Sequence, residues 1–292
     1  MTIPKGLSAF PITPADAAGR VDEAALRKLI TRLAQARVDS IGLLGSTGTY
    51  MYLTREARRR ALEVALEEAG GTPVIVSVGA LRTDDAVRIA QDARAAGAAA
   101  GLMPAVSYNP LTEDEVFTHF TTVARESGLP LVIYDNPVAT HFQFTEQLLR
   151  RLAAEPGIVA IKNSSAAPDR RAWFPPAFSV GCSGDWVCTE ALLGGQDVWY
   201  SVLGGVLPKT CLRIVRAAQQ GDAAEARRVN AALAPLWDLF KQHGGLRAVY
   251  ALADILGLCR AAPPKPILPV APSVKQRIAD VLREMPAGIV QD

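Results

Sequence analysis

The chain has 292 residues, of which 49% are hydrophobic and 21% are charged, and its formal net charge at pH 7 is +2. A chain of this length buries a large core without help from disulfides or metals, and a balanced charge without a basic block argues against nucleic acid or an anionic membrane surface as a partner. Four cysteines without a C-x-x-C pair, three histidines without zinc-ligand spacing and no membrane-length apolar run predict a cytoplasmic, metal-independent α/β protein with reduced thiols.

Eight short apolar segments follow one another from the start of the chain to about residue 203. Most of them are uninterrupted, as expected for parallel strands that are covered on both faces. The predicted strands are Gly6–Ile12, Ser40–Leu44, Pro73–Val78, Ala99–Met103, Leu129–Tyr134, Ile158–Lys162, Phe178–Cys182 and Trp199–Leu203.

Amphipathic helices are predicted between these strands. Thr112 opens a T-E-D-E sequence, a capping-box pattern, and the other helices are expected at Asp22–Ala36, from Thr54 to Ala69, and at Thr83–Ala96, Thr145–Ala154 and Val187–Leu193. Eight strand–helix units favour a (β/α)8 TIM barrel over a doubly wound sheet. We assign the catalytic barrel to residues 1–208 and a C-terminal helical region to residues 209–292, with helices at Lys209–Gln219, Ala223–His243, Gly245–Leu256 and Ser273–Met285.

The active site of such a barrel lies at the carboxyl ends of its strands. The second strand ends in Gly45-Ser46-Thr47-Gly48, where a tight turn offers amides and hydroxyls to a small anion, although a plain glycine-rich loop has the same composition. The fifth strand ends at Tyr134, which either relays a proton or is a buried structural tyrosine. Tyr108 follows the fourth strand and carries little information by itself.

The sixth strand ends in Lys162, the one lysine of seven that closes an apolar strand. Desolvating an ammonium group is costly, so such a side chain either extends to water or serves as an amine nucleophile. An amine in a barrel mouth is the usual means of forming a Schiff base with a keto substrate.

Taken together, these motifs resemble the pyruvate-dependent class I aldolases of the dihydrodipicolinate synthase/N-acetylneuraminate lyase family. The resemblance covers nearly the whole chain, including the helical tail. Its segments are Ala9-Phe10-Pro11-Ile12-Thr13-Pro14, Gly45-Ser46-Thr47-Gly48, Pro104 with Tyr108-Asn109, Tyr134 and Ile161-Lys162-Asn163-Ser164-Ser165.

The resemblance implies a role for each matching residue. Lys162 corresponds to the lysine that attacks the keto carbon, and Tyr134 to the tyrosine that moves protons. Ser46 links Tyr134 into a relay that Tyr108 completes, typically across a subunit interface. The implied substrate-binding residues are Thr47 and Gly48, which hold the pyruvate carboxylate, Gly184 and Asp185, which border the second-substrate pocket, and Ser201.

The implied activity is carbon–carbon bond formation or cleavage, or dehydration, on pyruvate or another 2-keto acid together with an aldehyde. The Schiff base on Lys162 is the only covalent catalysis that the resemblance implies, so neither a cofactor nor a metal is expected. Relatives are commonly tetramers or dimers, which implies a homo-oligomer, in particular a homotetramer. Neither nucleic acid nor membrane is an expected partner.

The sequence departs from the lysine-biosynthesis enzyme of this family at several loop positions. Ala139 stands where true dihydrodipicolinate synthases carry the arginine that clamps the aldehyde's carboxylate, and Thr49 and Gly205 replace an acidic residue and an asparagine common in relatives. His141 either replaces the lost contact or is a solvated loop residue.

The alternatives are therefore an authentic 4-hydroxy-tetrahydrodipicolinate synthase, which condenses pyruvate with aspartate semialdehyde, and a catalytically silent keto-acid-binding relative. A barrel that binds sugar phosphates through Gly204 and Gly205 ranks lower.

Overall fold

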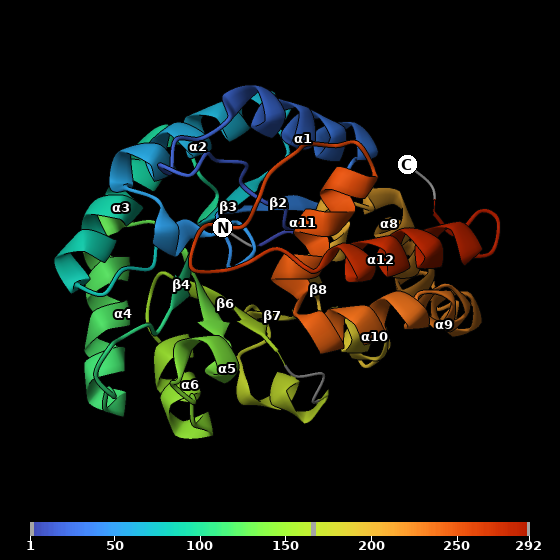
Figure 1. Ribbon diagram of the computed structural model, residues 1–292. Helices are drawn as coiled ribbons and strands as arrows, with labels where there is room; N and C mark the ends of the chain where they lie inside the picture. The colour runs from blue at the N-terminus through green and yellow to red at the C-terminus, as the bar shows by residue number, and fades with distance from the viewer. Residues whose placement is uncertain (1–2, 165–167, 291–292) are drawn as a thin grey trace.

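A computed structural model describes residues 3–164 and 168–290 of the chain. In this part of the chain eight parallel strands close into a barrel in sequence order, and helices surround it (Figure 1). The predicted (β/α)8 fold is confirmed. The strands are β1 (Gly6–Ala9), β2 (Ser40–Leu43), β3 (Val74–Ser77), β4 (Ala100–Pro104), β5 (Leu131–Asp135), β6 (Ile158–Asn163), β7 (Ser179–Cys182) and β8 (Val198–Ser201).

Helices follow the strands around the ring. Four of them begin after a predicted start residue whose side chain caps the helix, and the capping box between Thr112 and Glu115 is complete. Such a cap contributes about 1 kcal/mol to helix stability. The ring comprises α1 (Glu23–Ala36), α2 (Arg55–Glu68), α3 (Thr83–Ala96), α4 (Glu113–Ser127), α6 (Glu146–Ala153) and α7 (Cys188–Leu193), with the short α5 (Pro137–Thr140) after β5.

The barrel strands place alternate side chains in two apolar layers. On β5, Val132 and Tyr134 belong to the cluster inside the barrel, whereas Ile133 packs in the larger cluster between strands and helices. The register of β5 and β6 pairs Tyr134 with Lys162. Because strand side chains alternate and Ala160 also faces the interior, Lys162 points into the same interior as Tyr134.

The C-terminal region contains α8 (Pro208–Gln219), α9 (Ala223–Ala232), α10 (Ala234–His243), α11 (Gly245–Ile255) and α12 (Pro272–Glu284). The single helix predicted over Ala223–His243 is wrong, because the chain breaks at Leu233 into α9 and α10. Pro235 explains the break, since proline lacks the N–H of an interior helical residue and its ring collides with the preceding turn.

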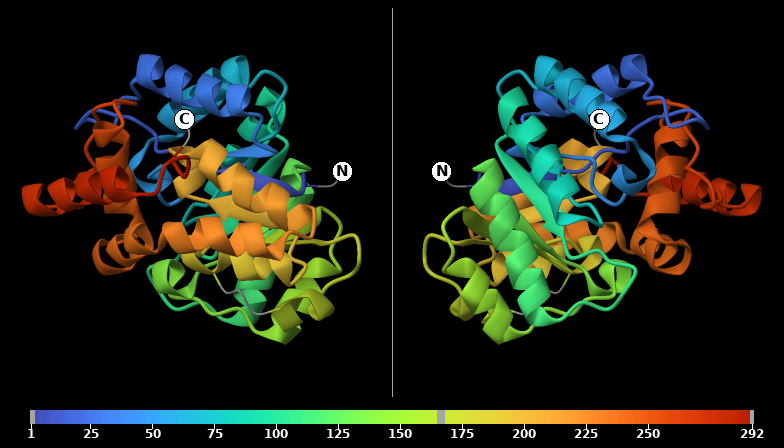
Figure 2. Two further views of the ribbon diagram at one scale, coloured as in Figure 1. Left: turned by 90° about the vertical axis from the view of Figure 1, so that its right-hand side faces the viewer. Right: turned by 90° about the vertical axis from the view of Figure 1, so that its left-hand side faces the viewer.

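Helix α8 packs on β1 and on α7, and so occupies the place of the eighth barrel helix. The division at residue 208 stays a prediction, and this packing favours a boundary after Gln219 instead. Helices α11 and α12, orange-red and red in Figure 2, lie at the side of the barrel away from the N-terminus. On that side, Leu246 of α11 lies beside residues from the carboxyl ends of the strands.

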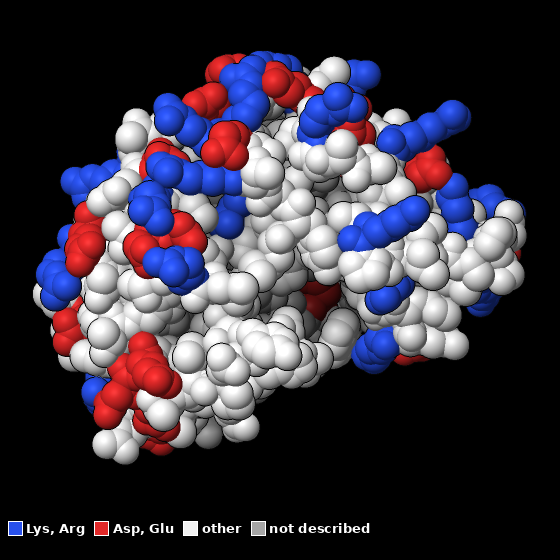
Figure 3. Space-filling view, turned by 60° about the vertical axis from the view of Figure 1, so that its left-hand side comes forward, with Lys and Arg blue, Asp and Glu red and all other residues white. Residues whose placement is uncertain are grey.

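The surface carries charges of both signs. Figure 3 shows basic and acidic side chains interspersed over the outer helices, while the hollowed centre of this face is mostly uncharged. Within the described residues, no helix is both long and apolar enough to cross a membrane.

Candidate active site

A cavity of about 550 Å³ opens at the carboxyl ends of the strands. Barrel segments supply most of its lining, and α10 and α11 close one side of it with Phe240 and Leu246. The lining also includes Phe10 after β1, Ser46 and Thr47 after β2, Tyr134 on β5, Asn136 and Val138 after it, Lys162 and Ser164 from β6, and Ser183, Gly184, Asp185, Trp186 and Val202 after β7 and β8. Most of the residues singled out from the sequence meet here.

Lys162 and Tyr134 form the buried centre of the cavity. Each is only 6% exposed. The Lys162 Nζ lies 4.0 Å from the centre of the Tyr134 ring and 5.4 Å from that of Phe10. Both rings lie within the distance of a cation–π contact with the amine.

Two side chains besides Lys162 hold the Tyr134 hydroxyl. Its oxygen lies 3.2 Å from the Ser46 Oγ and accepts a hydrogen bond of 2.9 Å from the Asn136 Nδ2. Burial alone raises the pKa of this phenol, but the charge of Lys162 and the hydrogen bonds from Ser46 and Asn136 outweigh it and bring the pKa below its usual value. A phenol tuned in this way can both give and take a proton.

The loop after β2 is tightly constrained. A Cβ on Gly48 would lie 2.8 Å from the Leu44 backbone, and one on Gly45 would lie 2.7 Å from the Phe10 ring, so both positions require glycine. Thr47 lies on this turn, buried and facing the cavity. The amides of Thr47 and Gly48 enter no hydrogen bond within the described residues, and they are the donors expected of an anion site.

Asp185 lines the cavity but its carboxylate faces the wall. It accepts hydrogen bonds of 2.8 Å from the Trp199 Nε1 and 2.8 Å from the Leu203 amide, and a longer one from Val202. Burial raises the pKa of this carboxyl, although these donors oppose the rise. Asp185 thus joins the β7 loop to the end of β8, and Gly184 beside it borders the cavity.

Two of the expected substrate-binding residues lie outside the lining of this cavity. The Ser201 side chain is fully buried, and its Oγ accepts a 2.8 Å hydrogen bond from the Gly204 amide. Gly48 supports the turn that presents Thr47. The structure therefore gives Ser201 and Gly48 a shaping role, and direct contact of either with substrate stays a prediction.

Tyr108 lies on a neighbouring cavity of about 480 Å³, which shares Ser46, Tyr134 and Leu246 with the first. Its side chain is 93% exposed. Within the described residues, no hydrogen bond joins it to Ser46 or Tyr134. The neighbouring cavity also holds Ala139 and His141, so His141 faces a different space from Lys162.

Several lining residues were not predicted from the sequence. Asn136 follows Tyr134 by two residues, but nothing in the sequence showed that the Asn136 amide turns back to the tyrosine hydroxyl. Trp186, Phe240 and Leu246 were also missed, because only the tertiary fold brings the tail over the barrel. Phe10 lay within a noted motif without an assigned role.

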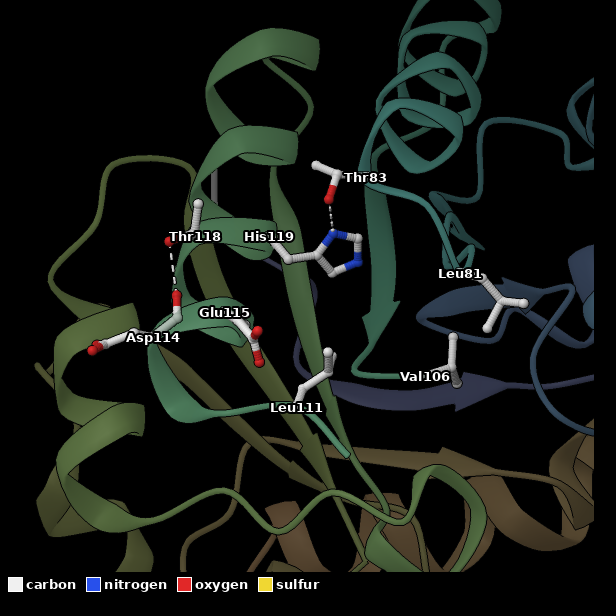
Figure 4. A pocket seen from close by; sticks show the side chains of 8 residues that line it. All are labelled: Leu81, Thr83, Val106, Leu111, Asp114, Glu115, Thr118 and His119. Carbon is white, nitrogen blue, oxygen red and sulfur yellow. Dashed lines mark hydrogen bonds between the residues drawn. The ribbon is translucent and has the colours of Figure 1, made fainter. Parts of the chain in front are cut away.

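A third hollow, of about 430 Å³, lies between α3 and α4 (Figure 4). The His119 Nδ1 is 2.9 Å from the Thr83 Oγ1, and burial lowers the pKa of this imidazole. The two acidic side chains that line this hollow already have partners. Glu115 caps α4, and Asp114 forms an ion pair of 3.0 Å with Arg151. This hollow is far poorer in reactive groups than the barrel mouth.

The described residues contain no cluster of three or more histidine, cysteine, aspartate or glutamate side chains placed to hold a metal ion. No disulfide joins the cysteines among these residues, and three of the thiols are buried.

Comparison with known proteins finds relatives that match most of the chain. Residues 3–285 match the model of the dihydrodipicolinate synthetase family. The chain is 31% identical over 284 residues to the 4-hydroxy-tetrahydrodipicolinate synthase of Methylococcus capsulatus, covering 95% of this chain and 97% of that one. It is 34% identical over 281 residues to the enzyme of that name from Thermomicrobium roseum, covering 94% and 92%.

Solved structures give the same result. The dihydrodipicolinate synthase from Agrobacterium tumefaciens superposes with a TM-score of 0.93 at 51% identity, covering 97% of this chain and 98% of that one. The enzyme from Acinetobacter baumannii, solved in complex with pyruvate, has a TM-score of 0.90 at 26% identity, with coverage of 97% and 98%.

Proposed function

The chain belongs to the dihydrodipicolinate synthetase family, and from this premise we propose that it uses Lys162 to form a Schiff base with pyruvate or a related 2-keto acid. The family makes it a lyase of the class I aldolase type. The observation that carries the residue assignment is a buried lysine amine 4.0 Å from the ring of a tyrosine whose hydroxyl is itself hydrogen-bonded. Pyruvate is the ligand of the related Acinetobacter baumannii structure.

The first half of the proposed reaction activates the keto acid. The Lys162 amine adds to the keto carbon, and the resulting carbinolamine loses its hydroxyl as water to leave an iminium ion. The carboxylate of the keto acid rests on the Thr47 hydroxyl and the amides of the turn at residues 46–48. The iminium cation accepts the electron pair of a C3–H bond, so a C3 proton leaves and an enamine forms.

The second half forms the carbon–carbon bond. The enamine carbon attacks the aldehyde carbon, the carbonyl electron pair moves to oxygen, and that oxygen takes a proton from Tyr134. Water then hydrolyses the iminium ion, which releases a 4-hydroxy-2-keto acid and restores the Lys162 amine. Cleavage is the same sequence in reverse, and loss of the 4-hydroxyl as water is the dehydratase variant. No cofactor takes part.

Tyr134 serves as the proton carrier of both halves, supported by Ser46 and Asn136. Its lowered pKa suits it to return as a base the proton it has given as an acid. The strongly exposed Tyr108 is suited to insertion into a second copy of the chain, beside the corresponding Ser46 and Tyr134. We accordingly expect a homo-oligomer, either a dimer or a tetramer. We also expect the protein to be cytoplasmic.

Reductive trapping tests the assignment. Borohydride added with pyruvate should leave a mass increment on the peptide that contains Lys162. Lys162→Met should abolish the adduct, whereas Lys275→Met, which removes a lysine paired with Asp254 far from the cavity, should retain it. The wild type without an adduct, or an adduct that survives Lys162→Met, would refute the proposal.

An authentic 4-hydroxy-tetrahydrodipicolinate synthase is the second candidate, favoured by the 51% identity to the Agrobacterium tumefaciens protein. This activity needs recognition of the carboxylate of aspartate semialdehyde, and Ala139 removes the expected guanidinium. An assay with that aldehyde and a coupled reductase decides between the two, and we expect a weak rate.

A further inference from the structure

The reactive groups of the cavity lie together, and much of the rest of the lining is apolar, apart from Ser164 and Ser183. The inner end consists of Ser46, Thr47, Tyr134, Asn136 and Lys162, and the outer wall of Val138, Trp186, Val202, Phe240 and Leu246. Lys162 and Tyr134 are each 6% exposed, whereas Val138 is 86% and Trp186 is 39% exposed. A keto acid bound to Lys162 at the inner end therefore leaves its partner facing the outer wall.

The lining of this cavity has a single cationic side chain within the described residues, that of Lys162. The Schiff base commits this nitrogen to the keto acid, and the enamine that attacks the aldehyde carries no positive charge there. Among the described residues of the lining, the one acidic side chain is that of Asp185, which is engaged with Trp199 and the turn after β8. A carboxylate or phosphate on the second substrate would thus lose water against the outer wall without a cation to receive it, which is strongly unfavourable.

The cations nearest to this region have other partners or other positions. The Lys241 Nζ lies 6.0 Å from the centre of the Trp186 ring, outside the lining, and 3.6 Å from an Asp238 carboxylate oxygen. Arg170 pairs with the buried Asp135 at 2.5 Å. Lys241 beside Trp186, and Arg247, which follows the lining residue Leu246 in the chain, are the rival explanations for recognition of an acid.

We propose that the second substrate is an aldehyde with an apolar substituent, aromatic or branched aliphatic, and without a second acidic group. This inference rests on the proposed Schiff-base function and adds the class of the aldehyde to it. A cavity of about 550 Å³ has room for a ring beyond the three carbons of pyruvate. Trp186 and Phe240 offer aromatic surface to such a ring, and Leu246 offers aliphatic surface.

The test compares aldehydes at saturating pyruvate. The apolar arm uses benzaldehyde and 3-methylbutanal, and the acidic arm uses succinic semialdehyde and glyceraldehyde 3-phosphate. We expect kcat/KM to be at least tenfold higher in the apolar arm. Equal values, or higher values in the acidic arm, would overturn the inference, and so would the loss of acidic-aldehyde turnover in Lys241→Met or Arg247→Met.

Substitutions in the outer wall test which side chains cause the preference for apolar aldehydes. Leu246→Ala should lower kcat/KM for 3-methylbutanal about tenfold, and Leu246→Met should restore most of it. Leu268→Ala removes the same atoms from a side chain that is 66% exposed and lies outside this cavity, and it should change nothing. An equal loss in Leu246→Ala and Leu268→Ala would contradict the assignment of the wall.

Val138→Arg supplies the missing cation at an exposed position that tolerates a long side chain. It should raise kcat/KM for succinic semialdehyde relative to benzaldehyde about tenfold, and an unchanged ratio would count against the argument from charge. Borohydride trapping with pyruvate is measured on every protein. Failure of trapping in the wild type refutes the Schiff-base function, whereas intact trapping with an acidic-aldehyde preference refutes only the substrate class.

Discussion

The inner end and the outer wall of the cavity are built from different parts of the chain. Strand ends and the turns directly after them supply the inner end, where neighbouring strands place Tyr134 and Lys162 side by side. The outer wall comes from the segments after β5, β7 and β8 and from α10 and α11. The barrel strands therefore fix the positions of the reactive side chains. The side chains proposed to contact the second substrate lie on loops and tail helices outside the barrel sheet.

This difference explains how one barrel can serve several aldehydes. A change at the inner end disturbs the barrel interior, which is close-packed and shared with Phe10 and Tyr200. A change at Val138 or Trp186 alters a partly exposed surface. Substitutions that separate turnover from selectivity therefore test the comparison directly.

Tyr134→Phe has the largest expected effect. It removes the proton carrier but keeps the ring that packs beside Lys162, so kcat should fall about 10²- to 10⁴-fold with the fold intact. The measurements are steady-state kinetics and circular dichroism.

Tyr200→Phe is the matched control for this change. Tyr200 is buried in the same barrel interior, and its hydroxyl has no hydrogen-bond partner among the described residues. It should retain turnover, because its hydroxyl is not part of the site. If Tyr134→Phe stayed within threefold of wild type, the inner end would not carry the proton transfer.

Asp185→Ala tests the junction between the two regions. It leaves the buried Trp199 Nε1 and the Leu203 amide without their acceptor, which should lower the free energy of unfolding by about 2–4 kcal/mol. Urea denaturation measures the loss. Asp238→Ala, at a carboxylate that is 77% exposed, should stay within about 0.5 kcal/mol of wild type. Equal stabilities of the two variants would contradict the structural role of Asp185.

The same comparison shows what could be predicted from the sequence. Lys162 and Tyr134 became candidates because both end predicted apolar strands, whose carboxyl ends meet at one face of the barrel, and the family resemblance then supplied their roles. The helix starts were found because Asp22, Thr54 and Thr112 supply recognisable cap side chains. Local patterns of this kind encode the inner end.

The outer wall could not be predicted in this way. Phe240 and Leu246 look like ordinary apolar positions of tail helices, and only long-range packing makes them part of the cavity. Side-chain direction was equally hidden, because Asp185 points into the wall and Ser201 caps the turn at Gly204. The break at Leu233 was open to prediction from Pro235, and the continuous helix was wrong for overlooking it.

Ser46→Ala has the smallest expected effect, since it removes one neutral hydrogen bond to Tyr134 and should lower kcat at neutral pH about two- to tenfold. Its sharper consequence is in the pH profile. The Ser46 hydrogen bond helps to lower the pKa of Tyr134, so its loss raises that pKa and keeps the phenol protonated to higher pH. The basic limb of kcat/KM should therefore move upward.

Asn136→Ala should move the basic limb in the same direction, because the Asn136 amide also donates to the Tyr134 oxygen. Ser46→Thr keeps a hydroxyl at the same point and should leave the limb near its wild-type position. A downward shift in Ser46→Ala would mean that the titrating group is not Tyr134. An upward shift in both alanine variants, with aldehyde selectivity unchanged, would show that the inner end tunes proton transfer independently of the outer wall.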